Sequence, residues 1–325
     1  MCTAITYKTR DHYFGRNLDL EYSYHEEVTI TPRNFHFRFR GMPEQRTHYA
    51  IIGMACVAEE YPLYYDATNE HGLSMAGLNF PYSSHYPAVK ASESFVTPFE
   101  LIPWVLSRCE TVTQAERLLE GMTLGDISFS AELPVTPLHW MVSDRDRSIV
   151  VEPMAEGLRA HKNHVGVLTN EPPFDIQMLW LSHFMGISSE TAENRLAPQV
   201  SLPAYSRGMG GMGLPGDLSS ASRFVRAAFT RLNSRSGPSE WESVSQFFHI
   251  LGSVEQQRGC VRLGKEAYEI TRYSSCCNTD RGIYYYKTYE DSRIKAVELH
   301  REDLDGDRLI RYPLLEERTF LLQNG

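Results

Sequence analysis

The residue best suited to covalent chemistry lies one position from the start of the chain. Cys2 directly follows Met1 in the opening segment Met-Cys-Thr-Ala-Ile-Thr-Tyr. If Met1 were removed, Cys2 would carry both a thiol and a free α-amine, which together make a nucleophile with its own base. Their reference pKa values are about 8.5 and about 7.7–8.0, so moving the proton from sulfur to nitrogen costs only about 1 kcal/mol. The resulting ammonium would stabilise the adjacent thiolate.

Two charged residues interrupt a strand-like segment shortly after Cys2. Arg16 and Asp19 lie in Gly-Arg-Asn-Leu-Asp at residues 15–19, beside the strand expected at the N-terminus. Charges within a strand pair with a specific partner when they are buried, so we expect Arg16 near the thiolate and Asp19 near the α-amine. Two simpler interpretations remain open here. Cys2 could be a chance edge-strand residue, and Arg16 with Asp19 could form an ion pair on a solvated strand.

Three later segments place an amide or a guanidinium where the chain changes direction. The segment 69–81 contains Asn79, residues 169–172 contain Asn170, and residues 214–224 contain Arg223 at the expected start of a helix. Asparagine at such positions ordinarily serves the turn itself. The same side chains could also supply hydrogen-bond donors to a site around Cys2.

Composition narrows the class of protein. The 325 residues are 42% hydrophobic and 22% charged, with a formal net charge of −9, which argues against a nucleic-acid partner because phosphate binding needs a basic face. The N-terminus has no basic segment followed by an apolar one, and no stretch is apolar for long enough to span a membrane. Six cysteines are too few for a disulfide scaffold in this length, so we expect a cytoplasmic protein.

The pattern of elements predicts an α+β fold in a single domain. Strand-like and helix-like patterns alternate in blocks, and no linker rich in Pro, Gly or Ser divides the chain. We therefore expect helices packed on a largely antiparallel sheet or pair of sheets. The expected strands are 5–7, 28–31, 49–57, 72–80, 138–151, 166–168, 268–273, 282–289 and 293–300, and the expected helices are 99–109, 112–119, 175–184, 220–232 and 239–251, with Thr111 as an N-cap.

Taken together, these segments resemble the choloylglycine hydrolase family, which contains bile salt hydrolases and penicillin V acylases. The resemblance runs in order from residue 1 to about residue 291. It implies an αββα sandwich over residues 2–325 and a nucleophile exposed when Met1 is removed. The matching segments are MCTAITYKT, YFGRNLDLEYSY, TITPRNF, DATNEHGLSMAGLNFP, TPLHWMVSD, VLTNEPPFDIQ, GLPGDLSSASRFVRAAF, RGCVRLG and YEITRYSSCCNTDRGIYYYKTYED.

The resemblance also implies a role for each candidate catalytic residue. Cys2 is then the nucleophile, and its amine is the base. Arg16 and Asp19 support the thiolate and the amine. Asn170 supplies an oxyanion donor from its side chain and Asn79 one from its backbone, while Arg223 holds the network together. Removing one such preorganised donor typically raises a barrier by about 2.7–4 kcal/mol.

Among the family's activities, the segments containing Asn79 and residues 274–278 favour a bile salt hydrolase. A sterol needs a broad apolar pocket, in which burial at roughly 25 cal/mol per Å² would be the main source of affinity. The same residues could instead simply fill the core, and Leu20 and residues 256–257 depart from the family pattern. The candidate pocket residues are Leu18, Leu20, Tyr24, Phe129, Leu133 and Val135.

Three alternatives use the same residues. Penicillin V could be the substrate, an amine could intercept the acyl-enzyme so that the protein acts as an acyltransferase, or the chain could be an inactive amphiphile-binding relative. The family suggests a homotetramer with no membrane partner. We expect no cofactor and no metal, because the glycine pattern at 208–213, the acidic run at 303–307 and the adjacent pair Cys276–Cys277 all lack the spacing that a nucleotide, calcium or zinc site requires.

Overall fold

The computed structural model describes residues 1–90 and 92–324, and within them the strands form two antiparallel sheets, one of six and one of eight strands. The six-stranded sheet has the order β10 (Val167–Leu168), β1 (Cys2–Lys8), β2 (His12–Leu20), β11 (Ile270–Asn278), β12 (Ile283–Thr288) and β13 (Lys295–Glu298). The eight-stranded sheet has the order β14 (Ile310–Pro313), β3 (Glu27–Thr31), β4 (Ile51–Ala58), β5 (Tyr61–Asn69), β6 (Ser74–Asn79), β7 (Leu138–Ser143), β8 (Ser148–Met154) and β9 (Gly157–Lys162).

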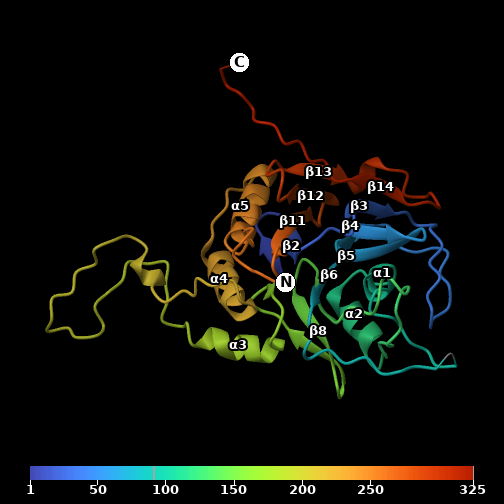
Figure 1. The fold of residues 1–325 in the computed structure, drawn as a ribbon, viewed down its shortest axis with the longest axis horizontal. Coiled ribbons are helices and arrows are strands. Elements are labelled where there is room, and N and C mark those ends of the chain that lie inside the picture. The colour runs from blue at the N-terminus through green and yellow to red at the C-terminus, as the bar shows by residue number, and fades with distance from the viewer. Residues whose placement is uncertain (91, 325) are drawn as a thin grey trace.

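Helices cover the outer face of each sheet (Figure 1). On the six-stranded sheet, α4 (Ser220–Asn233) packs on β1 and β10, and α5 (Glu240–Gly252) packs on β2 and β11. On the eight-stranded sheet, α1 (Leu101–Leu106) packs on β5 and β6, and α2 (Val112–Leu119) follows it. A further helix, α3 (Phe174–Ser182), packs on α4. The layers therefore run helix, sheet, sheet, helix, and the predicted αββα sandwich is confirmed.

Local sequence accounts for where several helices begin. The Thr111 side chain accepts a hydrogen bond from the backbone N–H of Gln114, which makes Thr111 the predicted N-cap of α2. At α5, Ser239 and Glu242 form a reciprocal capping box. The apolar residues of these helices then face the sheets, as their three- and four-residue spacing predicts.

Two apolar clusters fill the layers. The larger one lies between the two sheets and beneath α4 and α5, and it includes residues from β1, β2, β6 and β11. The smaller one lies on the outer face of the eight-stranded sheet beneath α1 and α2. Because β1 and β2 lie against β6 across the sandwich, polar residues on the facing sides of these strands are enclosed on both sides.

Some predicted elements differ from the observed ones. Residues 138–151 form two strands, β7 and β8, because Asp144 accepts hydrogen bonds from the backbone N–H groups of Asp146 and Arg147 and so makes a turn. The strand predicted at 293–300 ends at Glu298, where the 3₁₀ turn η2 (Leu299–Arg301) begins. We did not predict β5, which lies inside the eight-stranded sheet, or the two edge strands β9 and β14, whose residues are half-exposed or exposed. The glycine segment at 208–213 contains the 3₁₀ turn η1 (Met209–Gly211).

Candidate active site

Cys2 is the first residue of β1, and neighbouring strands enclose it. β1 lies between β10 and β2, with Cys2 opposite Leu18 and Ala4 opposite Arg16. Only 4% of the Cys2 surface is exposed, so it is not a chance surface residue. Arg16 and Asp19 are completely buried, which rules out an ion pair on a solvated strand. Each instead contacts a different set of partners.

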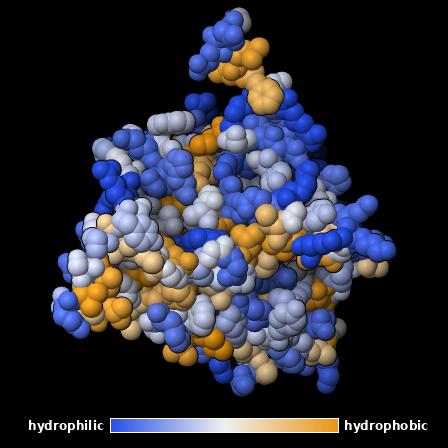
Figure 2. Space-filling view, turned by 60° about the vertical axis from the view of Figure 1, so that its left-hand side comes forward, coloured by the Kyte–Doolittle hydropathy of each residue, from blue (hydrophilic) through white to orange (hydrophobic). Residues whose placement is uncertain are grey.

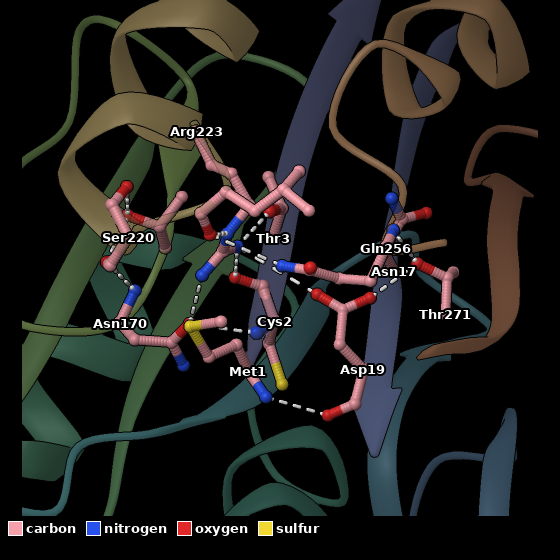
Figure 3. Close-up of polar contacts among 12 residues, drawn as sticks. Met1, Cys2, Thr3, Asn17, Asp19, Asn170, Ser220, Arg223, Gln256 and Thr271 are labelled. Atoms are coloured by element: carbon pink, nitrogen blue, oxygen red, sulfur yellow. Dashed lines mark hydrogen bonds and ion pairs between the residues drawn. The ribbon is translucent and has the colours of Figure 1, made fainter. Parts of the chain in front are cut away.

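Arg223 connects the elements that meet at Cys2. Its guanidinium donates to the Cys2 carbonyl oxygen at 2.5 Å, to Thr3 Oγ1 at 2.6 Å and to Asn170 Oδ1 at 2.7 Å. It also lies 3.9 Å from Asp19 Oδ2. Burial lowers the pKa of Arg223, and the negative charge of Asp19 opposes that effect. One side chain from the first turn of α4 thus fixes β1, β2 and residue 170 relative to one another (Figure 3).

The orientation of the Asn170 carboxamide follows from its neighbours. Its Oδ1 faces the Cys2 N–H at 2.8 Å and the Arg223 guanidinium, both of which can only donate, so this atom must be the oxygen. Its Nδ2 then donates to the Asn79 carbonyl oxygen at 2.8 Å. The Asn170 main chain is held by Ser220 Oγ at 2.8 Å and by the buried Gln177 side chain at 2.6 Å.

Asp19 lies on the other side of Arg223. Its Oδ1 accepts a hydrogen bond from Thr271 Oγ1 at 2.6 Å, and among the described residues its Oδ2 has no hydrogen-bond donor. Burial raises the pKa of Asp19, whereas Arg223 and the N-terminal ammonium lower it. Asp19 is therefore placed to interact with a cation at the start of β1.

Arg16 reaches from β2 across the sandwich to the opposite sheet. Its NH1 group donates to the carbonyl oxygens of Gly77 at 2.5 Å and Tyr65 at 3.1 Å. The pKa of Arg16 is raised overall. Burial lowers it, but nearby negative charges, including those of the Cys2 thiolate and Asp66, outweigh that effect. The main-chain N–H of Arg16 donates to Ser275 Oγ at 3.1 Å.

The neighbouring Gly15 allows β11 to approach β2 closely. A Cβ at Gly15 would lie 2.1 Å from the Ser275 carbonyl oxygen, a distance that no side chain tolerates. Because Ser275 contacts the main chain of Arg16, this close approach helps to hold the arginine in place.

Met1 extends β1 by one residue in this structure. Its ammonium donates to the Asp19 carbonyl oxygen at 2.7 Å and pairs with Glu269, and burial lowers its pKa. The nitrogen that would become the free amine of Cys2 is now an amide that donates to Asn170. Cleavage after Met1 would therefore leave that amine already within the Asn170–Arg223 network (Figure 3).

The candidate pocket residues fall into two groups. Leu18 belongs to the larger core opposite Cys2, and Leu20 packs against that core. Tyr24 follows β2, and its hydroxyl lies 2.6 Å from that of Tyr22.

The other three lie in the loop before β7. Phe129 packs with Tyr61 and Phe99, and its N–H donates to the Leu133 carbonyl oxygen at 3.1 Å. The Val135 N–H donates to Ser128 Oγ. These contacts do not include Cys2 or Asn170, so a role in substrate binding stays a prediction for all six residues.

Sequence reasoning missed several residues that support the site. Thr271 contacts Asp19, Gln177 holds residue 170, and Ser275 contacts Arg16. Each is an ordinary strand or helix residue that lies far from Cys2 along the chain. The local sequence around it therefore gives no sign of its role. By contrast, Cys2, Arg16, Asp19, Asn79, Asn170 and Arg223 are brought together as predicted, although their individual roles remain predictions.

Two other features are absent from residues 1–90 and 92–324, a metal site and a membrane-spanning helix. No group of three or more His, Cys, Asp or Glu side chains within these ranges could hold a metal ion. In the same ranges, no helix has both the length and the apolar character needed to cross a membrane.

Comparison with known proteins identifies the family. Residues 2–312 match the model of the linear amide C–N hydrolases of the choloylglycine hydrolase family. A bile salt hydrolase/transferase from Lactiplantibacillus plantarum is 52% identical over the full length of both chains, and one from Clostridium perfringens is 39% identical over 96% of each. A crystal structure of a variant conjugated bile acid hydrolase from Clostridium perfringens, 37% identical, superposes with a TM-score of 0.91 over 99% of this chain and 100% of that one. The chain therefore belongs to the choloylglycine hydrolase family.

Proposed function

We propose that this protein hydrolyses the amide bond of bile acids conjugated to glycine or taurine, through Cys2. The observation that carries this proposal is the hydrogen-bond network joining the Cys2 nitrogen, the Asn170 carboxamide and Arg223. It brings together a thiol, a prospective amine and an amide donor. The relatives that are 52% and 39% identical are named bile salt hydrolase/transferase, which supports bile salts as the substrate class.

The reaction begins with proton transfer within Cys2. Once Met1 is removed, the α-amine takes the thiol proton, and the thiolate attacks the carbonyl carbon of the substrate amide. The resulting tetrahedral oxyanion accepts two hydrogen bonds. One comes from the second N–H of the Asn170 carboxamide and the other from the backbone N–H of Asn79. The first Asn170 N–H remains on the Asn79 carbonyl oxygen and keeps these two donors in register.

The second half of the reaction releases both products. The Cys2 ammonium gives its proton to the leaving nitrogen as the carbon–nitrogen bond breaks, which frees glycine or taurine. The amine then takes a proton from water, and the hydroxide attacks the thioester and releases the bile acid. Asp19 stabilises the ammonium, Arg16 stabilises the thiolate, and Arg223 holds Asn170 and Asp19 on either side of Cys2.

Acyl transfer is a second candidate activity of the same thioester. Four relatives carry the name hydrolase/transferase, which favours interception of the acyl-enzyme by an amine in place of water. The penicillin V acylase structure from Agrobacterium tumefaciens is only 20% identical, so its TM-score of 0.76 concerns the fold and does not favour penicillin V as the substrate.

A single assay separates these activities. The purified protein is incubated with glycocholate, taurocholate and penicillin V, with and without an added amine, and the released amino acid or side-chain acid is quantified. We expect release from the bile salts, and amidated bile acid when an amine is added. Release from penicillin V alone would overturn the proposal, and no release from any substrate would favour an inactive amphiphile-binding relative.

We also propose a cytoplasmic homotetramer built from one domain. All six cysteines are unpaired thiols, which suits a reducing compartment. Strands from both chain ends support a single domain, because β14 pairs with β3. The segment between α3 and α4 extends away from the body, and Figure 2 shows apolar residues gathered on this side. Leu179 of α3 and Met185, Leu196 and Tyr205 of this segment are 65–88% exposed, which suits burial against another copy of the chain.

A further inference from the structure

Two buried charged side chains reach from one sheet to the other, in opposite directions. Arg16 starts on β2 of the six-stranded sheet and donates to carbonyl oxygens of the eight-stranded sheet. Asp66 starts on β5 of the eight-stranded sheet and accepts hydrogen bonds from the six-stranded one. Only 2% of Asp66 is exposed, and the mechanism above gives it no role.

Three hydroxyl groups converge on the Asp66 carboxylate. Tyr273 donates to Oδ1 at 2.7 Å, while Tyr284 and Ser275 donate to Oδ2 at 2.7 and 3.0 Å. Donors directed at both oxygens favour the ionised form over the protonated one. Ser275 also accepts from the Arg16 main chain, so the environments of the two charges share a residue.

A β-bulge in each sheet creates this arrangement. Between β4 and β5, Met54 pairs with Asp66 and Ala55 with Tyr64, so Tyr65 is an extra residue. Its carbonyl oxygen accepts the hydrogen bond from Arg16. A bulge of this kind redirects side chains and is common beside active sites.

A bulge in β11 redirects side chains of the six-stranded sheet in the same way. Between β11 and β2, Thr271 pairs with Asp19 and Tyr273 with Leu18, which leaves Arg272 as the extra residue. Thr271 then donates to Asp19, and Tyr273 donates to Asp66. One strand thus supplies donors to both buried carboxylates of the site.

Asp66 supplies a carboxylate near a cation that has none in direct contact. Among the described residues the Arg16 guanidinium donates only to main-chain carbonyl oxygens. The other buried cations have carboxylates of their own, since Arg223 lies 3.9 Å from Asp19 and the Met1 ammonium pairs with Glu269. Asp66 therefore offsets a buried positive charge beside Cys2 that would otherwise be costly.

We propose that Asp66 is a positioning residue of the Cys2 site, which balances Arg16 and thereby sets the electrostatic potential at the thiol. This role rests on the proposed function of Cys2 as the nucleophile. Asp66 offsets part of the attraction that Arg16 exerts on the thiolate. It therefore keeps the sulfur a good nucleophile, since a thiolate that a neighbouring cation stabilises too strongly attacks more slowly.

The groups that face Asp66 come from three strands. They are Arg16 on β2, Tyr273, Ser275 and Cys277 on β11, and Tyr284 on β12. The pKa of Asp66 is raised overall, because burial outweighs the lowering by Arg16 and the three hydroxyls. Burial also raises the pKa of Cys277 to about 12, so that thiol stays neutral and leaves Arg16 as the charged group acting on Asp66.

The test compares Asp66→Asn with the parent protein, both confirmed by mass to lack Met1. The rate of Cys2 alkylation by iodoacetamide is measured from pH 5 to 10, and the Cys2 peptide is quantified by mass spectrometry because Cys260 is exposed and reacts too. Loss of the negative charge should lower the pH at which alkylation reaches half its maximal rate by on the order of one unit, because one buried negative charge fewer opposes formation of the thiolate. The kcat on glycocholate should fall as well.

A control variant distinguishes this effect from simple destabilisation. Tyr64→Phe removes another buried hydroxyl from β5, one that contacts Thr31 and Thr29 instead of Asp66. It should lower thermal stability without moving the alkylation midpoint. An unchanged or raised midpoint in Asp66→Asn would overturn the role proposed for Asp66.

A second variant keeps the test decisive if Asp66→Asn does not fold. The double change Tyr273→Phe and Tyr284→Phe removes two of the three donors, which should raise the pKa of Asp66 and neutralise it in the lower part of the pH range. The alkylation midpoint should move in the same direction by a smaller amount, and no movement would contradict the proposal. Alkylation does not depend on bile salt turnover, so this result is independent of whether the proposed function holds.

Discussion

The main-chain nitrogen of Cys2 and the side-chain oxygen of Asn170 lie 2.8 Å apart, although 168 positions separate them in the chain. Arg223, another 53 positions further on, donates to the same oxygen. Because the oxygen is fully engaged by donors, the carboxamide cannot rotate without losing both hydrogen bonds. Its nitrogen is thereby held toward Asn79, where an oxyanion donor is needed.

Replacing the Asn170 carboxamide should mainly lower the catalytic rate. In Asn170→Asp, the side chain keeps its shape and the acceptor for Cys2 and Arg223, but it loses the Nδ2 donor and gains a negative charge. We expect kcat on glycocholate to fall by at least about 100-fold, with a much smaller change in KM. Steady-state kinetics of glycine release measure this effect, and a variant that loses only substrate affinity would show that Asn170 does not act on the transition state.

Replacing Arg223 should affect both stability and activity. In Arg223→Lys, the charge stays, but one ammonium cannot reach the four acceptors that the guanidinium contacts on Cys2, Thr3, Asn170 and Leu218. We expect a loss of about 3 kcal/mol in the free energy of unfolding, measured by urea titration. Arg226→Lys, one turn further along α4 and half-buried, is the matched control and should cost much less. Equal losses would mean that Arg223 is no more than a packing residue.

Acid should destabilise the fold through His12. Burial lowers the pKa of His12 to about 4 from an ordinary value of 6.5, and its ring lies within hydrogen-bond distance of Thr279 and Ser143. The folded state therefore favours the neutral ring, so stability is lost as the pH falls from about 6.5 toward 4. From pH 7 to pH 4.5 the loss should be about 2–3 kcal/mol, at 1.36 kcal/mol per unit of pKa difference.

The variant His12→Asn tests the source of that loss. It removes the titrating ring, so its free energy of unfolding should fall less between pH 7 and pH 4.5 than that of the parent protein. Chemical denaturation at both pH values measures the two slopes. Parallel pH dependence in the two proteins would assign the acid sensitivity to other groups.

The exposed apolar residues of α3 and of the segment between α3 and α4 should control assembly. Leu179→Glu combined with Leu196→Glu places charges on two leucines that are 65% and 88% exposed. If they lie in a tetramer interface, light scattering after gel filtration should show smaller species for this variant. Leu263→Glu, on a different loop and 54% exposed, should leave the mass unchanged. A tetramer that survives the double change would place the interface elsewhere.

The sequence predicted the reacting residues better than their support. Cys2 stands out because loss of Met1 would give it a free amine, and Arg16 and Asp19 because they are charges within a strand-like segment. The family resemblance then assigned roles to Asn79, Asn170 and Arg223. Asp66 and Thr271 carry no such signal, since their partners lie 207 and 252 positions away. The partner of Gln177 is only seven positions away, but a glutamine within a helix gives no sign that it holds a site residue. The layered fold followed from the order of strand-like and helix-like blocks, whereas β5 and the edge strands β9 and β14 were not predicted.

The most direct test of the account compares two forms of the protein that differ only in Met1. One form is confirmed by intact mass to begin at Cys2, and the other keeps Met1 because it is produced with methionine aminopeptidase inhibited. The account predicts that the first form releases glycine from glycocholate and that the second does not, because its Cys2 nitrogen is an amide and cannot accept the thiol proton. Equal turnover by both forms would contradict the central role of the Cys2 amine.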